Sequence, residues 1–125
     1  MRRKRILVVE DDPHQRLAIS VQLRANRYAP VFAADAVFAL AAAQRERPDL
    51  MVLDLRLPGG DGITVLEYMR MIPRLADVPI LVLAGRGPNA ARRRFLQVGA
   101  AAFFQKPVAS RHFLAAIHAA LGDGE

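Results

Sequence analysis

The sequence predicts an α/β fold in which helices cover both faces of a five-stranded parallel sheet. Short apolar runs rich in branched side chains alternate with segments whose apolar residues recur at helical spacing. The connections between these segments are short, as in successive strand–helix units. Charged side chains stand at the ends of three of the apolar runs. Parallel strands would bring such side chains to one edge of the sheet, where open α/β folds carry their sites.

Five strands and five helices are expected in alternation. The expected strands cover residues 5–9, 31–34, 49–55, 78–84 and 101–105. The expected helices run from 13 to about 26, from 36 to about 47, from 62 to before Pro73, from 88 to 99 and from about 109 to 121. Asp12 and Asp35 are typical helix N-caps, and Gly99 is a typical helix end. Pro30 favours an edge position for the second strand.

Length and composition limit the class of protein. With 125 residues, the chain is expected to be one domain over 1–125, with a basic extension over 1–4 and a frayed tail over 122–125. The absence of cysteine excludes disulfides and thiolate metal sites. No apolar run approaches the roughly 20 residues of a membrane span, so we expect a cytoplasmic protein without membrane contact. The net charge of +6 suits an acidic or phosphorylated partner, but 6% aromatics and no Trp predict no direct binding of nucleic acid.

The central apolar run ends in a carboxylate, Asp54, and a Pro-Gly-Gly turn follows over residues 58–60. Because an acid is costly to bury inside a strand, Asp54 is expected at the exposed end of its strand. Glu10 and Asp11 close the first run in the same way, and Lys106 closes the fifth. If the strands are parallel, these four side chains project from the same edge of the sheet.

These residues, in this order, resemble the receiver domain of two-component response regulators. The resemblance rests on residues 6–13, 52–62, 78–83, 99–100 and 106–107 and covers essentially the whole chain. It implies a flavodoxin-like, doubly wound (βα)5 fold with strand order 2-1-3-4-5, as in chemotaxis receivers. That order makes the first and third strands neighbours, which brings Glu10 and Asp11 beside Asp54.

The resemblance also implies a chemistry. Three carboxylates in one cleft should attract a hard divalent cation, and the family implies Mg²⁺ held by Asp11, Asp54 and the backbone carbonyl of Arg56, with Glu10 acting through water. Asp54 would accept a phosphoryl group from a phosphohistidine of a sensor histidine kinase or histidine phosphotransfer protein, and Lys106 would stabilise the phosphoryl charge. Such a domain is a regulatory phosphoacceptor in a phosphorelay and not an enzyme with a separate substrate.

Two positions depart from the family pattern. The family usually has Thr or Ser at the end of the fourth strand, where its hydroxyl binds a phosphoryl oxygen, and this chain has Ala84. The aromatic switch residue three positions before Lys106 is Phe103, where Tyr is common. The acceptor chemistry is therefore expected to be intact, with an atypical switch output. The family also implies a cis peptide bond between Lys106 and Pro107.

Other interpretations remain open at this point. One is an atypical receiver-like interaction module that signals independently of phosphorylation, through a basic surface that recruits a kinase, an output domain or an identical chain. Another is a Mg²⁺-dependent phosphohydrolase, which would want an Asp-x-Asp after the first strand that residues 10–12 do not supply. In receivers, the face made by the fourth helix, fifth strand and fifth helix contacts an output domain or forms a homodimer. Residues 85–90 fit a dinucleotide-binding pattern but lack a following acid at the usual distance.

Overall fold

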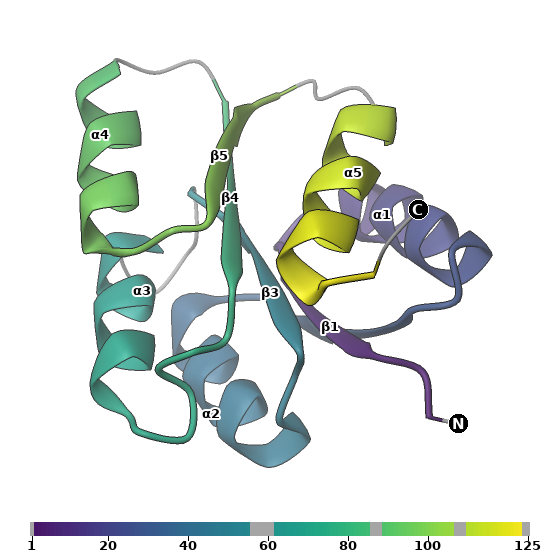
Figure 1. Ribbon diagram of the computed structural model, residues 1–125, viewed down its shortest axis with the longest axis horizontal. Coiled ribbons are helices and arrows are strands. Elements are labelled where there is room, and N and C mark those ends of the chain that lie inside the picture. Colours follow the sequence, from purple (N-terminus) through teal and green to yellow (C-terminus); the bar gives the residue numbers. More distant parts are fainter. Residues whose placement is uncertain (1, 56–61, 86–88, 107–109, 124–125) are drawn as a thin grey trace.

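The computed structural model describes residues 2–55, 62–85, 89–106 and 110–123. Its five strands form one parallel sheet in the order β2-β1-β3-β4-β5 (Figure 1). The strands are β1 (Arg5–Val9), β2 (Ala29–Ala33), β3 (Leu50–Asp54), β4 (Ile80–Ala84) and β5 (Ala102–Gln105). The helices are α1 (Pro13–Ala25), α2 (Ala36–Glu46), α3 (Gly62–Met71), α4 (Asn89–Val98) and α5 (Ser110–Leu121). The predicted fold class and strand order are confirmed.

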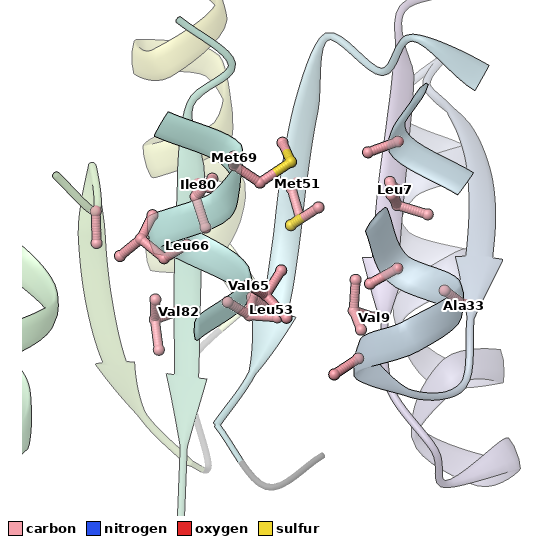
Figure 2. Close-up of a cluster of buried hydrophobic side chains, with 14 of the residues drawn as sticks. Leu7, Val9, Ala33, Met51, Leu53, Val65, Leu66, Met69, Ile80 and Val82 are labelled. Atoms are coloured by element: carbon pink, nitrogen blue, oxygen red, sulfur yellow. The ribbon is translucent and has the colours of Figure 1, made fainter. Parts of the chain in front are cut away.

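The sheet separates two apolar clusters. Alternate strand residues point to opposite faces, so Leu7, Met51 and Val82 pack under α2, α3 and α4, while Val8, Val52 and Leu81 pack under α1 and α5. Figure 2 shows the first cluster, with Val65, Leu66 and Met69 of α3 lying over β3 and β4. Every residue of β3 and β4 is buried, which is why these segments read as uninterrupted apolar runs.

The predicted helix caps are present. The side chain of Asp12 accepts a hydrogen bond from the backbone N–H of His14, and that of Asp35 accepts one from Phe38. Gly99 ends α4 with a φ of 113°, a backbone conformation that a residue with a Cβ rarely adopts. The two caps mark where α1 and α2 begin, and Gly99 marks where the chain leaves α4 before β5.

Arg70, in the last turn of α3, holds two turns of the chain together. Its guanidinium donates hydrogen bonds of 2.8 Å to the carbonyls of Ala76, Val78 and Gly99. The first two lie before β4 and the third lies between α4 and β5. No sequence pattern indicated this role of Arg70, because backbone acceptors leave no mark in a sequence.

The second strand lies at the sheet edge, as Pro30 predicted, but it covers Ala29–Ala33 instead of 31–34. The backbone N–H of Ala29 donates to the carbonyl of Lys4 in the β1 direction. Since N–H groups alternate in direction along a strand, the nitrogen of Pro30 faces the open edge and no ladder hydrogen bond is lost there. β1 has the expected bounds, and the bounds of β3, β4 and β5 differ from the expected ones by at most two residues.

Residue 123 departs from the frayed tail expected over 122–125. The Asp123 carboxylate accepts hydrogen bonds from the Lys4 ammonium and from the Tyr28 hydroxyl, both at 2.8 Å. The Lys4 ammonium also donates to the carbonyl of Leu121 at 2.9 Å. These contacts join the basic N-terminal extension to the end of α5. Within the described residues, no helix has the length and apolarity needed to cross a membrane.

Candidate functional site

The predicted site residues meet at the carboxyl edge of the sheet. Glu10 follows β1, Asp54 is the last residue of β3, and Lys106 follows β5. β1 and β3 are neighbours with Val9 opposite Leu53, so the residue after each of these positions, Glu10 and Asp54, stands beside the other. The backbone N–H of Lys106 donates to the carbonyl of Ala84 at 2.6 Å, which fixes the start of the lysine side chain against the end of β4.

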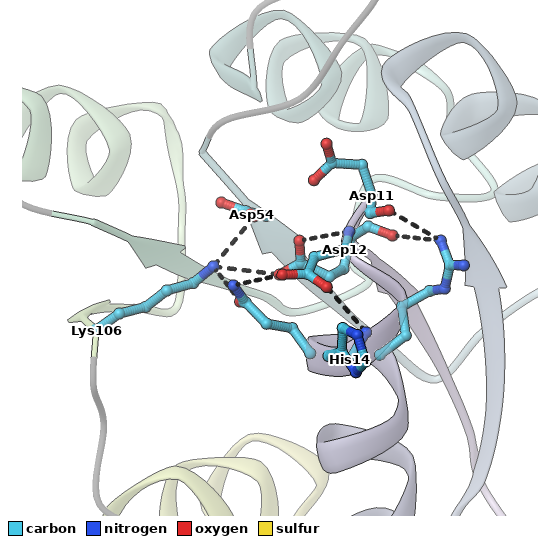
Figure 3. Close-up of polar contacts among 8 residues, drawn as sticks. Asp11, Asp12, His14, Asp54 and Lys106 are labelled. Atoms are coloured by element: carbon cyan, nitrogen blue, oxygen red, sulfur yellow. Dashed lines mark hydrogen bonds and ion pairs between the residues drawn. The ribbon is translucent and has the colours of Figure 1, made fainter.

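The Lys106 ammonium lies among three oxygen atoms (Figure 3). It is 3.2 Å from Glu10 Oε1, 3.1 Å from Asp54 Oδ2 and 2.7 Å from Gln15 Oε1. An ammonium group has three N–H donors and no acceptor, so these three contacts match its donor count. The lysine side chain is 24% exposed, which leaves it reachable from solvent.

Asp54 occupies the predicted strand end, but the prediction that it would be exposed is wrong. The residue is only 4% exposed and Glu10 only 1%. Two carboxylates can be buried together here because the Lys106 ammonium contacts both and the backbone N–H of Asp12 donates to Glu10 Oε2 at 3.2 Å. A carboxylate at the end of a strand can therefore be buried if a cation and N–H donors contact it.

The surroundings of Glu10 favour its neutral form. Burial is the main cause that raises its pKa from the ordinary value of 4.5 to about 7, followed by the hydrogen bond and the negative charge of Asp54. The Asp12 N–H and the Lys106 ammonium act in the opposite direction. The Lys106 ammonium therefore does not fully offset the rise in the Glu10 pKa that burial and Asp54 cause.

The acidic side chains fit a hard cation. Carboxylate oxygens of Glu10, Asp11 and Asp54 all lie within 4.8 Å of one another, and Asp11 is exposed to solvent. Figure 3 shows Asp11 and Asp54 on the same side of the site. Several carboxylate oxygens with access to water form the donor set that Mg²⁺ prefers. The backbone carbonyl of Arg56, the fourth predicted ligand, lies outside the described residues.

The two predicted switch positions lie on neighbouring strands. Ala84 ends β4 and is buried. Phe103, on β5, packs against Phe95 of α4 with ring centroids 5.9 Å apart. Pro107, and with it the predicted cis peptide bond between Lys106 and Pro107, lies outside the described residues.

Sequence reasoning missed two residues of the first turns of α1. Gln15 contacts the Lys106 ammonium, and the guanidinium of Arg16 donates to the backbone carbonyl of Glu10 at 3.0 Å. The only signal for either was its position after a capped helix start, since the third helical side chain tends to reach back toward the N-cap.

A model of the response regulator receiver domain matches residues 6–118. The chain belongs to this family. Among curated relatives of this receiver domain, the phosphate regulon transcriptional regulatory protein PhoB of Escherichia coli K12 is 35% identical over 118 residues, covering 94% of this chain and 52% of PhoB. The response regulator MprA of Mycobacterium leprae is 39% identical over 117 residues, covering 94% of this chain and 50% of MprA. The chain spans about half the length of these relatives.

Solved structures agree with the receiver fold. A response regulator from Chloroflexus aurantiacus superposes with a TM-score of 0.91 at 28% identity, covering 96% of this chain and 98% of that one. The receiver domain of a sensor histidine kinase from Pseudomonas aeruginosa PAO1 superposes with a TM-score of 0.87 at 29% identity, covering 97% and 99%. That structure has a magnesium ion coordinated in its active-site cleft.

The raised pKa of Glu10 predicts a pH-dependent stability for the metal-free receiver. Folded protein holds this proton to a higher pH than the unfolded chain, so the free energy of unfolding should fall as pH rises from about 4.5 to about 7. Asp54→Asn removes one cause of the raised pKa and should stabilise the protein, on the order of 1 kcal/mol at pH 8 and less at pH 5. Urea unfolding of both proteins at the two pH values measures this difference.

Glu67→Gln is the matched control, because Glu67 is an exposed acid of α3. It should leave the pH dependence as it is in the unsubstituted protein. Equal stability of Asp54→Asn and unsubstituted protein at pH 8 would contradict the argument that the buried acids repel one another.

Proposed function

We propose that Asp54 is the phosphoacceptor of this receiver and Lys106 its charge-stabilising partner. The observation that carries the proposal is the Lys106 ammonium 3.1 Å from Asp54 Oδ2, beside a cluster of three carboxylates at the sheet edge. A carboxylate is a weak nucleophile, so phosphoryl transfer to it depends on position and on compensation of charge. Both are provided by the residues that surround Asp54.

The transfer forms one bond and breaks another. An Asp54 carboxylate oxygen forms the new O–P bond while the N–P bond of a phosphohistidine breaks and its electron pair returns to the imidazole nitrogen. The Lys106 ammonium faces the oxygens of the arriving group and stabilises the negative charge that they carry. Glu10, Asp11 and Asp54 would hold Mg²⁺, which when bound supplies a second positive charge to the phosphoryl oxygens.

The donors that fit this site are phosphohistidine proteins. We propose a sensor histidine kinase or a histidine phosphotransfer protein as the partner, in the cytoplasm where such kinases use ATP. The receiver is then regulatory, and its own residues carry out its phosphorylation. We propose that residues 1–125 are one receiver domain. The relatives include transcriptional regulators about twice as long as this chain, and we propose no direct binding of nucleic acid by residues 1–125.

The acceptor role predicts the addition of one phosphoryl group. Incubation with acetyl phosphate and Mg²⁺ should raise the intact mass by one phosphoryl unit, and both Asp54→Asn and removal of Mg²⁺ should abolish the addition. Asp77→Asn is the matched control and should be phosphorylated normally, because Asp77 is exposed and precedes β4 at the other edge of the sheet. A folded protein that takes up no phosphoryl group would favour the interaction module that signals without phosphorylation.

The output switch is proposed to be atypical. Ala84 has no hydroxyl with which to bind a phosphoryl oxygen, and it is buried at 2% exposure. Phe103 packs against Phe95 and has no hydroxyl to exchange partners. A hydrogen bond to a charged group contributes about 1.5–3 kcal/mol, so its absence weakens any phosphate-driven shift of the β4–α4 region.

Restoring the hydroxyl should restore the response. In Ala84→Thr, phosphorylation should change amide hydrogen exchange in α4 and β5, whereas in the unsubstituted protein the change should stay close to Asp54. Ala84→Val is the matched control, because Val adds the same volume at this buried position without a hydroxyl. Equal responses in the Thr and Val variants would show that the hydroxyl is not what this receiver lacks.

The face made by α4, β5 and α5 is basic. Residues 78–122 contain no Asp or Glu and six Lys or Arg. Arg92, Arg93, Arg94 and Arg111 are exposed, and none forms an ion pair with another described residue. A symmetric dimer brings the same patch of both copies together, which would place arginine against arginine. We propose that this face binds an acidic protein partner and not a second copy.

An exposed apolar side chain on this face supports a protein partner. Leu96 is 38% exposed on α4, one turn after Arg92 and Arg93. An acidic protein surface with an apolar residue at its centre would complement this arrangement, whereas a phosphate backbone would leave Leu96 without a contact.

The charge of the face predicts a monomer. In sedimentation velocity at low ionic strength, the receiver should remain monomeric with and without acetyl phosphate. A dimer that is lost in Leu96→Arg and kept in Met71→Arg, a matched change at an exposed residue of α3, would contradict the proposal.

A poly-glutamate peptide should shift NMR signals of α4 and the start of α5, and a larger response to duplex DNA would reassign the face to nucleic acid.

A further inference from the structure

We propose that Gln15 is a positioning residue that anchors the Lys106 ammonium for phosphoryl transfer without cancelling its charge. The inference rests on the proposed acceptor function and assigns to the same site a further residue from α1. Gln15 Oε1 lies 2.7 Å from Lys106 Nζ, closer than either carboxylate oxygen at 3.1 and 3.2 Å. The shortest contact of the catalytic cation is thus with a neutral side chain.

The orientation of the amide follows from its neighbours. Lysine only donates hydrogen bonds, so the Gln15 atom that faces Lys106 is the oxygen. The amide nitrogen then faces Asp12 Oδ2 at 3.4 Å. Asp12 is itself fixed as the N-cap of α1, because its other carboxylate oxygen accepts from His14. The helix cap therefore holds the amide in the orientation that offers its oxygen to the lysine.

The local backbone leaves Gln15 free for this contact. A Gln at the third helical position commonly accepts a hydrogen bond from the N–H of the N-cap residue. Here the N–H of Asp12 donates to Glu10 Oε2 at 3.2 Å, so the capping acceptor is supplied by Glu10. The Gln15 oxygen is released from the capping role and turns toward the site.

The neutrality of the anchor matters because the site is already acidic. One ammonium group contacts Glu10 and Asp54, and a carboxylate oxygen of Asp11 lies within 4.8 Å of those of both acids. When the Asp54 carboxylate forms the O–P bond, the ammonium must turn part of its donor capacity from Asp54 to a phosphoryl oxygen. The Gln15 amide oxygen would hold Lys106 Nζ in place during that exchange. Because the amide is neutral, the positive charge of the ammonium stays available to the phosphoryl group. A carboxylate in its place would add a further acid that opposes the incoming phosphate.

The chain allows a direct test of the anchor in metal-free protein. Lys4 and Lys106 are its two lysines, so selective ¹⁵N labelling gives one ammonium signal for each. Gln15→Met keeps the length of the side chain and removes the acceptor oxygen. In this variant the Lys106 signal should report increased motion of the ammonium, while the Lys4 signal, which reports the contacts with Asp123 and Leu121, should not change.

The kinetic consequence is tested by a double-mutant cycle. Gln15→Met should slow phosphorylation by acetyl phosphate about tenfold, the effect typical of one lost hydrogen bond to a charged group. The same substitution in Lys106→Met should have no further effect, because the residue that it anchors is absent. Gln44→Met, at an exposed position of α2, is the matched control for the added methionine and should keep the unsubstituted rate.

The outcomes separate the two proposals. A normal rate and an unchanged Lys106 signal in Gln15→Met overturn the anchor while leaving Asp54 as the acceptor. An equal loss of rate in the presence and absence of Lys106 assigns Gln15 a role in folding or metal binding and also overturns it. A protein that takes up no phosphoryl group contradicts the acceptor function, and the Lys106 signal still decides whether Gln15 holds the ammonium.

Discussion

The contact of one ammonium group with two buried carboxylates is the interaction on which this receiver depends. Glu10 and Asp54 end neighbouring strands and are almost fully buried, so each needs a partner that the apolar core cannot supply. Lys106 contacts both from the far end of the sheet, and it can do so because β5 lies beside β4 and the lysine backbone is bonded to Ala84. The compensation is incomplete, and the remaining negative charge makes the site suitable for a bound cation.

The sequence predicted those features that depend on one residue and its immediate neighbours in the chain. Strand ends are marked by charged side chains that cannot continue into the core, which identified Glu10, Asp54 and Lys106. Helix starts are marked by side chains that cap N–H groups, which identified Asp12 and Asp35. The order of the strands could not be obtained in this way, because alternation of strands and helices is compatible with several arrangements. It came from the resemblance to receivers, and the structure confirms it.

Other features depend on contacts between distant segments and were not predictable. The burial of Asp54 requires a lysine 52 positions later in the chain, and the contact of Gln15 with that lysine spans 91 positions. The anchoring of Asp123 likewise requires Lys4 and Tyr28. In each case the partners are polar residues far apart in the sequence. Nothing in the sequence pattern indicates their pairing, which exists only in the folded structure.

The candidate site follows the family pattern more closely than the two switch positions do. The acids and the lysine expected of a receiver are all present, whereas Ala84 and Phe103 lack the two hydroxyls that the resemblance leads one to expect at these positions. Residues 78–122, which include α4, β5 and α5, also contain no Asp or Glu. Ala84 and Phe103 both belong to the proposed switch, so these differences concern the proposed output and not the carboxylates and the lysine of the candidate site.

The three hydrogen bonds of Arg70 have a mechanical consequence for α4. They tie the turn after α4, through the carbonyl of Gly99, to α3 and to the residues before β4. The end of α4 is therefore fastened, while its start at Asn89 lies toward the edge of the sheet that carries Asp54. Any displacement of α4 would accordingly be a rotation about its last turn, with little movement at Val98 and the largest movement at the end nearest Asp54. The guanidinium of Arg70 would be the fixed point of that rotation.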